Sequence, residues 1–147
     1  MPDLLTLKNG MRCYVDPMPG FESAAIGVWV EAGAIDETPE ESGVAHLLEH
    51  MAFKGTTKRT ARQIAEEIES VGGYLNAATG YQRTGYYARV LKGDVERAID
   101  ILADILTDPL FDEGELEKEK EVVVQEIGEA FDQPDDAVHD LLQQKMF

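Results

Sequence analysis

The pentapeptide His46-Leu47-Leu48-Glu49-His50 holds two of the three histidines in the chain. Histidines four residues apart on a helix lie one above the other on the same face, so their imidazoles can share one metal ion. Glu49 follows His46 by three residues, so its side chain lies near the same metal position without having to bind the metal. A catalytic zinc site takes three protein ligands and keeps a fourth position for water. The pentapeptide therefore predicts two zinc ligands and a general base, and the third ligand must come from elsewhere. The alternative is an amphipathic helix whose paired histidines are solvated.

Length and composition are those of one soluble globular domain over residues 1–147. Hydrophobic residues make up 44% of the chain and charged residues 29%, which is ordinary for such a domain. No apolar run approaches the roughly 20 residues that a membrane span needs. The N-terminus lacks the basic region and the long apolar run of a secretory signal, and the single cysteine, Cys13, fits a reducing compartment. We therefore expect a cytoplasmic protein without a membrane span.

The charge of the chain argues against nucleic acid as a partner. The formal net charge is −16, whereas a phosphate backbone is bound by clustered Lys and Arg. Acidic residues concentrate at 112–121 and 126–136. Such a surface could attract a cationic peptide and speed its arrival, or it could only keep the protein soluble. Both interpretations stay open.

The first part of the chain predicts a hairpin, a strand and the helix that carries the pentapeptide. Asn9-Gly10 is a turn signal between the short apolar runs of residues 5–16. Residues 24–31 are apolar almost throughout and are predicted to form a buried central strand. Ser42 is predicted to cap a helix over residues 43–53.

The next part predicts a helix followed by two strands. A capping box at Thr60 and Gln63 begins the helix, which ends at Gly72-Gly73. Residues 74–79 and 84–91 are the predicted strands.

Three further helices are predicted after these strands. Asp94 caps the first of them, and the side chains expected to face the core are Ile99, Leu102, Ile105 and Leu106. Another capping box at Asp112 begins a helix that runs to about residue 130, and Asp135 caps the last helix. This order of elements predicts an α+β domain, with a mostly antiparallel sheet packed against helices and the zinc site on a helix.

The third zinc ligand should be a carboxylate held near the histidine helix, and its surroundings favour Glu126. It lies beside Val123 and Ile127, in the apolar part of the fourth predicted helix, where a carboxylate is costly to bury unless it is paired or binds a metal. Glu119 lies two turns earlier on the same face and could accept a hydrogen bond from a ligating imidazole. The alternative for Glu126 is a charged residue at the edge of a packed stripe.

The spacing of His46, Glu49, His50 and Glu126 resembles the signature of the inverzincin zinc proteases, the family of pitrilysin, insulysin and the mitochondrial processing peptidase. The resemblance runs in the same order along nearly the whole chain. The further segments that carry it are residues 31–37, 50–56, 72–79 and 119–126. The chain resembles the bacterial, processing-peptidase-like branch in particular, which would place it in the cytoplasm of a bacterium.

The resemblance implies one zinc ion per chain, held by His46, His50 and Glu126, with Glu119 supporting the site. Glu49 would be the general base that takes a proton from a water activated by the metal. The implied activity is that of a zinc metalloendopeptidase, which hydrolyses peptide bonds of extended peptides.

The resemblance also implies where a peptide or small protein substrate would lie. Asn76, Ala77 and Thr79 would meet the substrate backbone, since a strand can pair with an extended peptide. Phe53 would line a substrate pocket. An ordinary sheet strand is the alternative for residues 74–79.

Members of this family are much longer than this chain, and a second, related half closes the catalytic chamber over the zinc. We therefore expect residues 1–147 to be the N-terminal catalytic domain of a longer chain, weakly active or inactive by itself. The second half would come from the same chain or from a partner subunit, a homodimer included. A noncatalytic zinc-binding or assembly subunit is the alternative function, because the family also contains inactive members. A structural zinc site would need a fourth protein ligand, and Cys13 is far away in the sequence.

Overall fold

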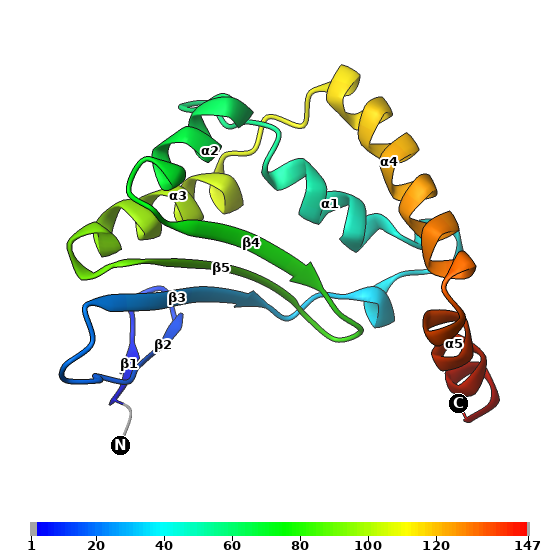
Figure 1. Cartoon of the computed structure of the whole chain (residues 1–147), viewed down its shortest axis with the longest axis horizontal. Coiled ribbons are helices and arrows are strands. Elements are labelled where there is room, and N and C mark those ends of the chain that lie inside the picture. The colour runs from blue at the N-terminus through cyan, green and yellow to red at the C-terminus, as the bar shows by residue number, and fades with distance from the viewer. Residues whose placement is uncertain (1–2, 147) are drawn as a thin grey trace.

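The computed structural model describes residues 3–146. Its centre is a three-stranded antiparallel sheet of β3 (Ser23–Val30), β4 (Tyr74–Thr79) and β5 (Thr84–Leu91), in the order β3-β5-β4. Three helices cover one face of the sheet (Figure 1), namely α1 (Val44–Ala52), α2 (Ala61–Glu69) and α3 (Val95–Thr107). The predicted α+β class, with an antiparallel sheet packed against helices, is confirmed.

The hydrophobic core lies between the helices and the sheet. Its apolar side chains recur every third or fourth residue on the helices and every second residue on β5, so each element buries one face. The buried members are Ala52, Ile64, Ile68, Ala77, Tyr86, Ala88, Val90, Ala98, Ile101, Leu102 and Ile105. This core holds α1 against the sheet.

Strand β3 lies at an edge of the sheet, and the prediction of a buried central strand at residues 24–31 was wrong. β5 is the central strand and pairs with both neighbours, whereas Trp29 on β3 is 63% exposed. The indole of Trp29 lies over Gly27 and Gly85. A Cβ at Gly27 would collide with the indole, and a Cβ at Gly85 would lie only 3.2 Å from it. An apolar run reports apolar residues on both faces of a strand, and it does not tell a central strand from an edge strand.

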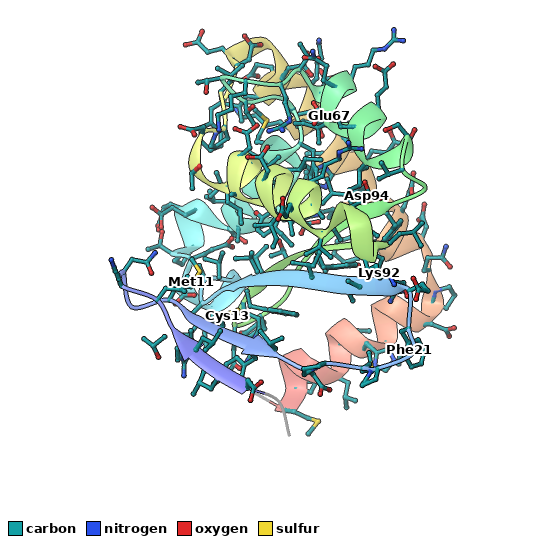
Figure 2. The ribbon with its side chains drawn as sticks, turned by 90° about the vertical axis from the view of Figure 1, so that its left-hand side faces the viewer. Met11, Cys13, Phe21, Glu67, Lys92 and Asp94 are labelled. Atoms are coloured by element: carbon teal, nitrogen blue, oxygen red, sulfur yellow. The ribbon has the colours of Figure 1, made fainter. Side chains whose placement is uncertain are left out.

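The predicted N-terminal hairpin is confirmed. β1 (Asp3–Thr6) and β2 (Arg12–Val15) pair in antiparallel fashion as a separate two-stranded sheet. Asn9 accepts a hydrogen bond from the backbone of Met11 within the turn, and Gly10 has a positive φ of 88°. Figure 2 shows Met11 and Cys13 in this hairpin, on the side of β3 away from the helices.

Two predictions about α2 and α3 met different outcomes. The capping box of α2 is confirmed, since Thr60 and Gln63 each accept a hydrogen bond from the other's backbone N–H. On α3, the prediction that Ile99 faces the core was wrong, because Ile99 is 50% exposed. Ala98 and Ile101 occupy the buried face of the helix in its place.

The chain ends in two helices that leave the sheet (Figure 1), α4 (Glu113–Asp132) and α5 (Pro134–Met146). Asp112 caps α4 by accepting from the backbone N–H of Glu115. A capping box also predicts a bond from the backbone N–H of Asp112 to the carboxylate of Glu115. In the structure this carboxylate pairs with Lys118 instead. The prediction that Asp135 caps α5 was wrong, because the helix begins at Pro134, whose fixed φ suits a first helical position.

The remaining regular elements are short 3₁₀ helices in the connections, η1 (Ala34–Asp36), η2 (Pro39–Glu41) and η3 (Lys92–Asp94). None of the helices within residues 3–146 combines the length and the apolar character that crossing a bilayer requires.

Candidate metal centre and active site

Three side chains converge where α1 meets α4. Nε2 of His46 and Nε2 of His50 lie 3.2 Å apart, and Oε2 of Glu126 lies 3.5 Å from each of them. The histidines come from successive turns of α1 and the carboxylate from α4, which packs alongside α1 (Figure 1). The structure therefore brings together the three residues that the sequence analysis named as ligands.

The size of this triangle fits zinc. Ligand atoms at the corners of a tetrahedron, about 2.0–2.2 Å from zinc, lie about 3.3–3.6 Å from one another. The three measured separations of 3.2, 3.5 and 3.5 Å are close to this range. Two imidazoles and one carboxylate are also a donor set that zinc takes in catalytic sites.

The apolar neighbours of Glu126 in the sequence suggested a buried position, but the structure does not bury this residue. Its side chain is 45% exposed, and Ile127 beside it is exposed as well. Val123, one turn before Glu126 on the same helix, is buried. The triangle is therefore open to solvent on the Glu126 side, and a water or a substrate could approach it there.

Glu119 is buried behind the histidines, with 5% of its surface exposed. Its Oε2 lies 3.0 Å from Nδ1 of His50, and its Oε1 pairs with Nζ of Lys54. Burial alone would raise the pKa of Glu119, but the hydrogen bonds from Lys54 and His50 outweigh burial and lower the pKa below its ordinary value. An ionised Glu119 accepts the Nδ1–H of His50, which leaves the lone pair of Nε2 facing the triangle.

Glu49 has a carboxylate oxygen without a partner. Its Oε2 is buried, and no hydrogen bond reaches it from the residues that the structure describes. Burial, followed by the negative charge of Glu49, raises the pKa of Tyr86 on β5. An unpaired buried carboxylate oxygen costs free energy and points to a functional role. It fits a base that receives a proton from a bound water.

The start of α1 is fixed by Glu37, and the prediction that Ser42 caps this helix was wrong. The two carboxylate oxygens of Glu37 accept from the backbone N–H groups of Gly43 and Ala45, each at 2.7 Å. Gly43 has a φ of 93°, which favours glycine and turns the chain into the helix. Glu37 therefore fixes the N-terminal end of α1, which lies next to His46.

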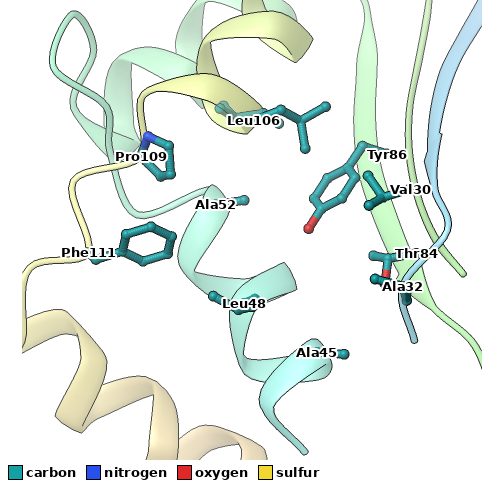
Figure 3. Close-up of a pocket in the computed structure, with 11 residues that line it drawn as sticks. Val30, Ala32, Ala45, Leu48, Ala52, Thr84, Tyr86, Leu106, Pro109 and Phe111 are labelled. Carbon is teal, nitrogen blue, oxygen red and sulfur yellow. The ribbon is translucent and has the colours of Figure 1, made fainter. Parts of the chain in front are cut away.

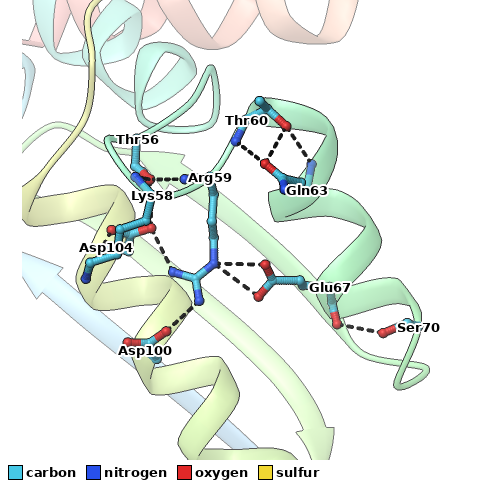
Figure 4. A network of polar contacts seen from close by, with 9 residues as sticks. All are labelled: Thr56, Lys58, Arg59, Thr60, Gln63, Glu67, Ser70, Asp100 and Asp104. Atoms are coloured by element: carbon cyan, nitrogen blue, oxygen red, sulfur yellow. Dashed lines mark hydrogen bonds and ion pairs between the residues drawn. The ribbon is translucent and has the colours of Figure 1, made fainter.

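The segment that follows α1 is anchored to α3 by a network around Arg59 (Figure 4). Asp104 is fully buried and accepts from Oγ1 of Thr56 and from Nη1 of Arg59, each at 2.7 Å. Arg59 also pairs with Glu67 of α2 and Asp100 of α3. The network ties the C-terminal end of α1 to two helices of the core.

The predicted substrate residues lie on or beside β4, which is the other edge strand of the sheet. Asn76 is exposed on the face away from the helices, whereas Ala77 is buried in the core. Oγ1 of Thr79 donates to the carbonyl of Ala45 at 3.4 Å. β4 therefore runs next to the start of the histidine helix.

Phe53 follows α1 and lines a pocket of about 270 Å³ between α2 and β4. Its ring lies 6.3 Å from that of Tyr86, between centroids. A second, largely apolar pocket of about 250 Å³ separates α1 from the sheet. Figure 3 shows Leu48 and Ala52 of α1 on one side of it, with the hydroxyl of Tyr86 pointing toward α1 from the other.

Two residues of the site were missed from the sequence, Glu37 and Lys54. Lys54 carried a signal, because it follows His50 by one helical turn, just as His50 follows His46. Glu37 carried none, because it lies six residues before the first backbone N–H that it caps, outside the spacing of any capping box.

Comparison with known proteins agrees with this fold. A protease from Helicobacter pylori, known from its crystal structure, superposes with a TM-score of 0.82 at 27% identity. The match covers 86% of this chain and 30% of that one. The fold is therefore that of a protease domain.

The sequence model of insulinase, peptidase family M16, matches residues 17–147. This chain belongs to that family, and its predicted resemblance to insulysin and the processing peptidases is confirmed. An uncharacterized zinc protease, YmxG, of Bacillus subtilis is 50% identical over 93% of this chain and 34% of its own length. A probable mitochondrial-processing peptidase subunit beta of Arabidopsis thaliana is 44% identical over 97% of this chain and 27% of its own length. The chain thus spans about a third of the curated relatives it matches.

Proposed function

We propose that this chain is the zinc-binding catalytic domain of a metalloendopeptidase that hydrolyses peptide bonds of extended peptides. The triangle of Nε2 of His46, Nε2 of His50 and Oε2 of Glu126 is the observation that carries the proposal. Its spacing suits one zinc ion per chain, and its open side leaves room for the reactants.

The residues around the triangle divide the work of binding the metal. His46, His50 and Glu126 would hold zinc, and Glu119 would keep the imidazole of His50 in the tautomer that can bind it. Zinc held there would supply the positive charge that lowers the pKa of a water molecule and polarises a peptide carbonyl.

Glu49 moves the proton. Its unpaired Oε2 accepts a proton from the attacking water and then passes it to the leaving amine of the peptide. Ligands for zinc would be sufficient in a noncatalytic assembly subunit, but such a subunit has no use for a buried carboxylate oxygen without a partner, so Oε2 of Glu49 favours an enzyme.

The outer side of β4 aligns the substrate. An edge strand has unpaired backbone groups that can bond an extended peptide as an additional strand. Ala77 and Thr79 are two residues apart and present their backbone groups to the same side of β4, while Ala77 is buried and the side chain of Thr79 bonds to α1. Asn76 presents its backbone to the other side and takes part through its exposed side chain, whose amide oxygen accepts from the backbone N–H of Ala77 at 2.9 Å. The pocket lined by Phe53 receives a substrate side chain.

The rest of the protein completes the catalytic chamber. The curated relatives are about three times as long as this chain. A second, related half, in the same polypeptide or in a partner subunit of a dimer, then closes over the zinc and holds the peptide in place. The single cysteine of the chain suits a reducing compartment, such as the bacterial cytoplasm.

The test is cleavage of a fluorescence-quenched peptide by the full-length protein, with Glu49→Gln and Glu40→Gln compared. Glu40 lies exposed on η2 and serves as the matched control. Glu49→Gln should retain zinc and lose about 10²–10⁴-fold in cleavage rate, and a chelator should abolish the wild-type activity. Cleavage that survives both the substitution and the chelator would refute the proposed function.

A further inference from the structure

Lys54 forms an ion pair with the buried carboxylate of Glu119 behind the candidate metal site. It follows α1 directly after Phe53, and its backbone N–H donates to the carbonyl of Met51, which fixes it to the last turn of the helix. Its ammonium pairs with Oε1 of Glu119, while Oε2 of the same carboxylate lies 3.0 Å from Nδ1 of His50. The two oxygens of Glu119 thus have one partner each.

This arrangement links two elements behind the metal triangle. Lys54 and His50 belong to α1 and the segment just after it, whereas Glu119 belongs to α4, two turns before Glu126 on the same face. A carboxylate on a flexible side chain can rotate about its last bond. With Oε1 held by an ammonium, that rotation is stopped, and Oε2 stays in the plane where it can accept from Nδ1.

Glu119 is buried, so its bonds have no substitute in water. A buried carboxylate that loses one charged partner leaves an oxygen without a hydrogen bond, at a substantial free-energy cost. The side chain would then turn toward whatever donor remains, and the imidazole of His50 would lose its fixed orientation.

We propose that Lys54 is a positioning residue for the zinc site, which orients His50 through Glu119 and thereby sets the affinity for the metal. This inference rests on the proposed function, because it assumes that His50 is a zinc ligand. Loss of a hydrogen-bonding partner behind a metal ligand typically weakens metal binding about 10–100-fold. Lys54 acts one bond further from the ligand than Glu119 does, so removal of its ammonium should have an effect at the lower end of this range, about 10-fold.

The experiment measures the zinc dissociation constant of the full-length protein by competition with a chromophoric chelator. Lys54→Met keeps the aliphatic stem and removes the charge, and Lys54→Arg keeps a cation. Lys120→Met is the matched control, because Lys120 also lies beside Glu119 in sequence but pairs with the exposed Glu117 at 2.7 Å. The inference predicts an increase in the dissociation constant of about 10-fold for Lys54→Met, recovery in Lys54→Arg, and no change for Lys120→Met.

The outcomes separate this inference from the proposed function. A wild-type protein that binds no zinc would refute the proposed function itself. A wild type that binds zinc, with Lys54→Met binding it equally well, would overturn the role of Lys54 alone. Circular dichroism checks that the variants fold, and Lys54→Gln replaces Lys54→Met if the latter does not. Unfolding of both would also overturn the inference, because Lys54 would then act on the fold rather than on the metal site.

Discussion

Removal of Asp104 should destabilise the protein far more than removal of its exposed neighbour Asp100. Both carboxylates pair with Arg59 from α3, but the side chain of Asp104 is fully buried and that of Asp100 is 58% exposed. The comparison therefore holds the residue type and the arginine partner constant. It changes burial, the bond that Thr56 donates to Asp104, and the ion pair of Asp104 with Lys58 at 3.6 Å.

The expected magnitude follows from these contacts. Breaking a buried ion pair by removing one partner costs about 3–5 kcal/mol. Arg59 keeps Glu67 and Asp100 after Asp104→Ala, so the lower end applies, about 3 kcal/mol. At roughly 2–4 °C per kcal/mol, this lowers the unfolding temperature by about 6–12 °C. Asp100→Ala should cost less than about 1 kcal/mol, as expected for an exposed pair.

The pH dependence gives a second measurement of the same contact. Burial would raise the pKa of Asp104, but hydrogen bonds from Arg59 and Thr56 lower it below its ordinary value. A carboxylate with a lowered pKa stabilises the folded state above its unfolded pKa of about 3.9 and loses this contribution as the pH falls through the folded pKa. The difference between wild type and Asp104→Ala should therefore shrink below about pH 4.

Thermal unfolding followed by circular dichroism measures both effects. Equal destabilisation by Asp100→Ala and Asp104→Ala would refute the reasoning. So would a difference between wild type and Asp104→Ala that stays constant from neutral pH down to about pH 3.

Two further predictions concern the metal site. Glu126→Gln should weaken zinc binding more than the roughly 10–100-fold typical of a lost supporting bond. Glu129→Gln, which removes the charge of an exposed partner of Gln125, should leave zinc binding unchanged. Equal dissociation constants in a chelator competition would show that another carboxylate binds the metal. Glu37→Ala should lower the free energy of unfolding by about 1–2 kcal/mol, because two backbone N–H groups at the start of α1 lose their acceptor. Denaturant unfolding measures this loss and should show none for Glu40→Ala, whose side chain is exposed. A Glu37→Ala variant as stable as the wild type would contradict the cap.

Short-range patterns predicted the elements well, because their physics is local. The capping box at Thr60 depends on residues three apart, and the convergence of His46 and His50 depends on the pitch of a helix. Both could be read from the chain without knowledge of the tertiary structure, and both are present.

Contacts between distant segments could not be predicted in the same way. Burial of Glu119 depends on how α4 lies against α1, and its pairing with Lys54 follows from that packing. The sequence placed Glu126 in a buried stripe, yet it lies at an open edge where several apolar neighbours are exposed too. The position of β3 in the sheet was likewise decided by pairing with β5 rather than by its own apolar run.

X-ray absorption at the zinc edge, together with the zinc content of the purified protein, tests the central claim most directly. The geometry of His46, His50 and Glu126 predicts about one zinc per chain, with nitrogen and oxygen ligands at about 2.0–2.2 Å and imidazole scattering from two histidines. Substitution of His46 and His50 by alanine should remove this metal. A protein that takes up no zinc, or one whose zinc has a sulfur ligand at about 2.3 Å, would contradict the claim.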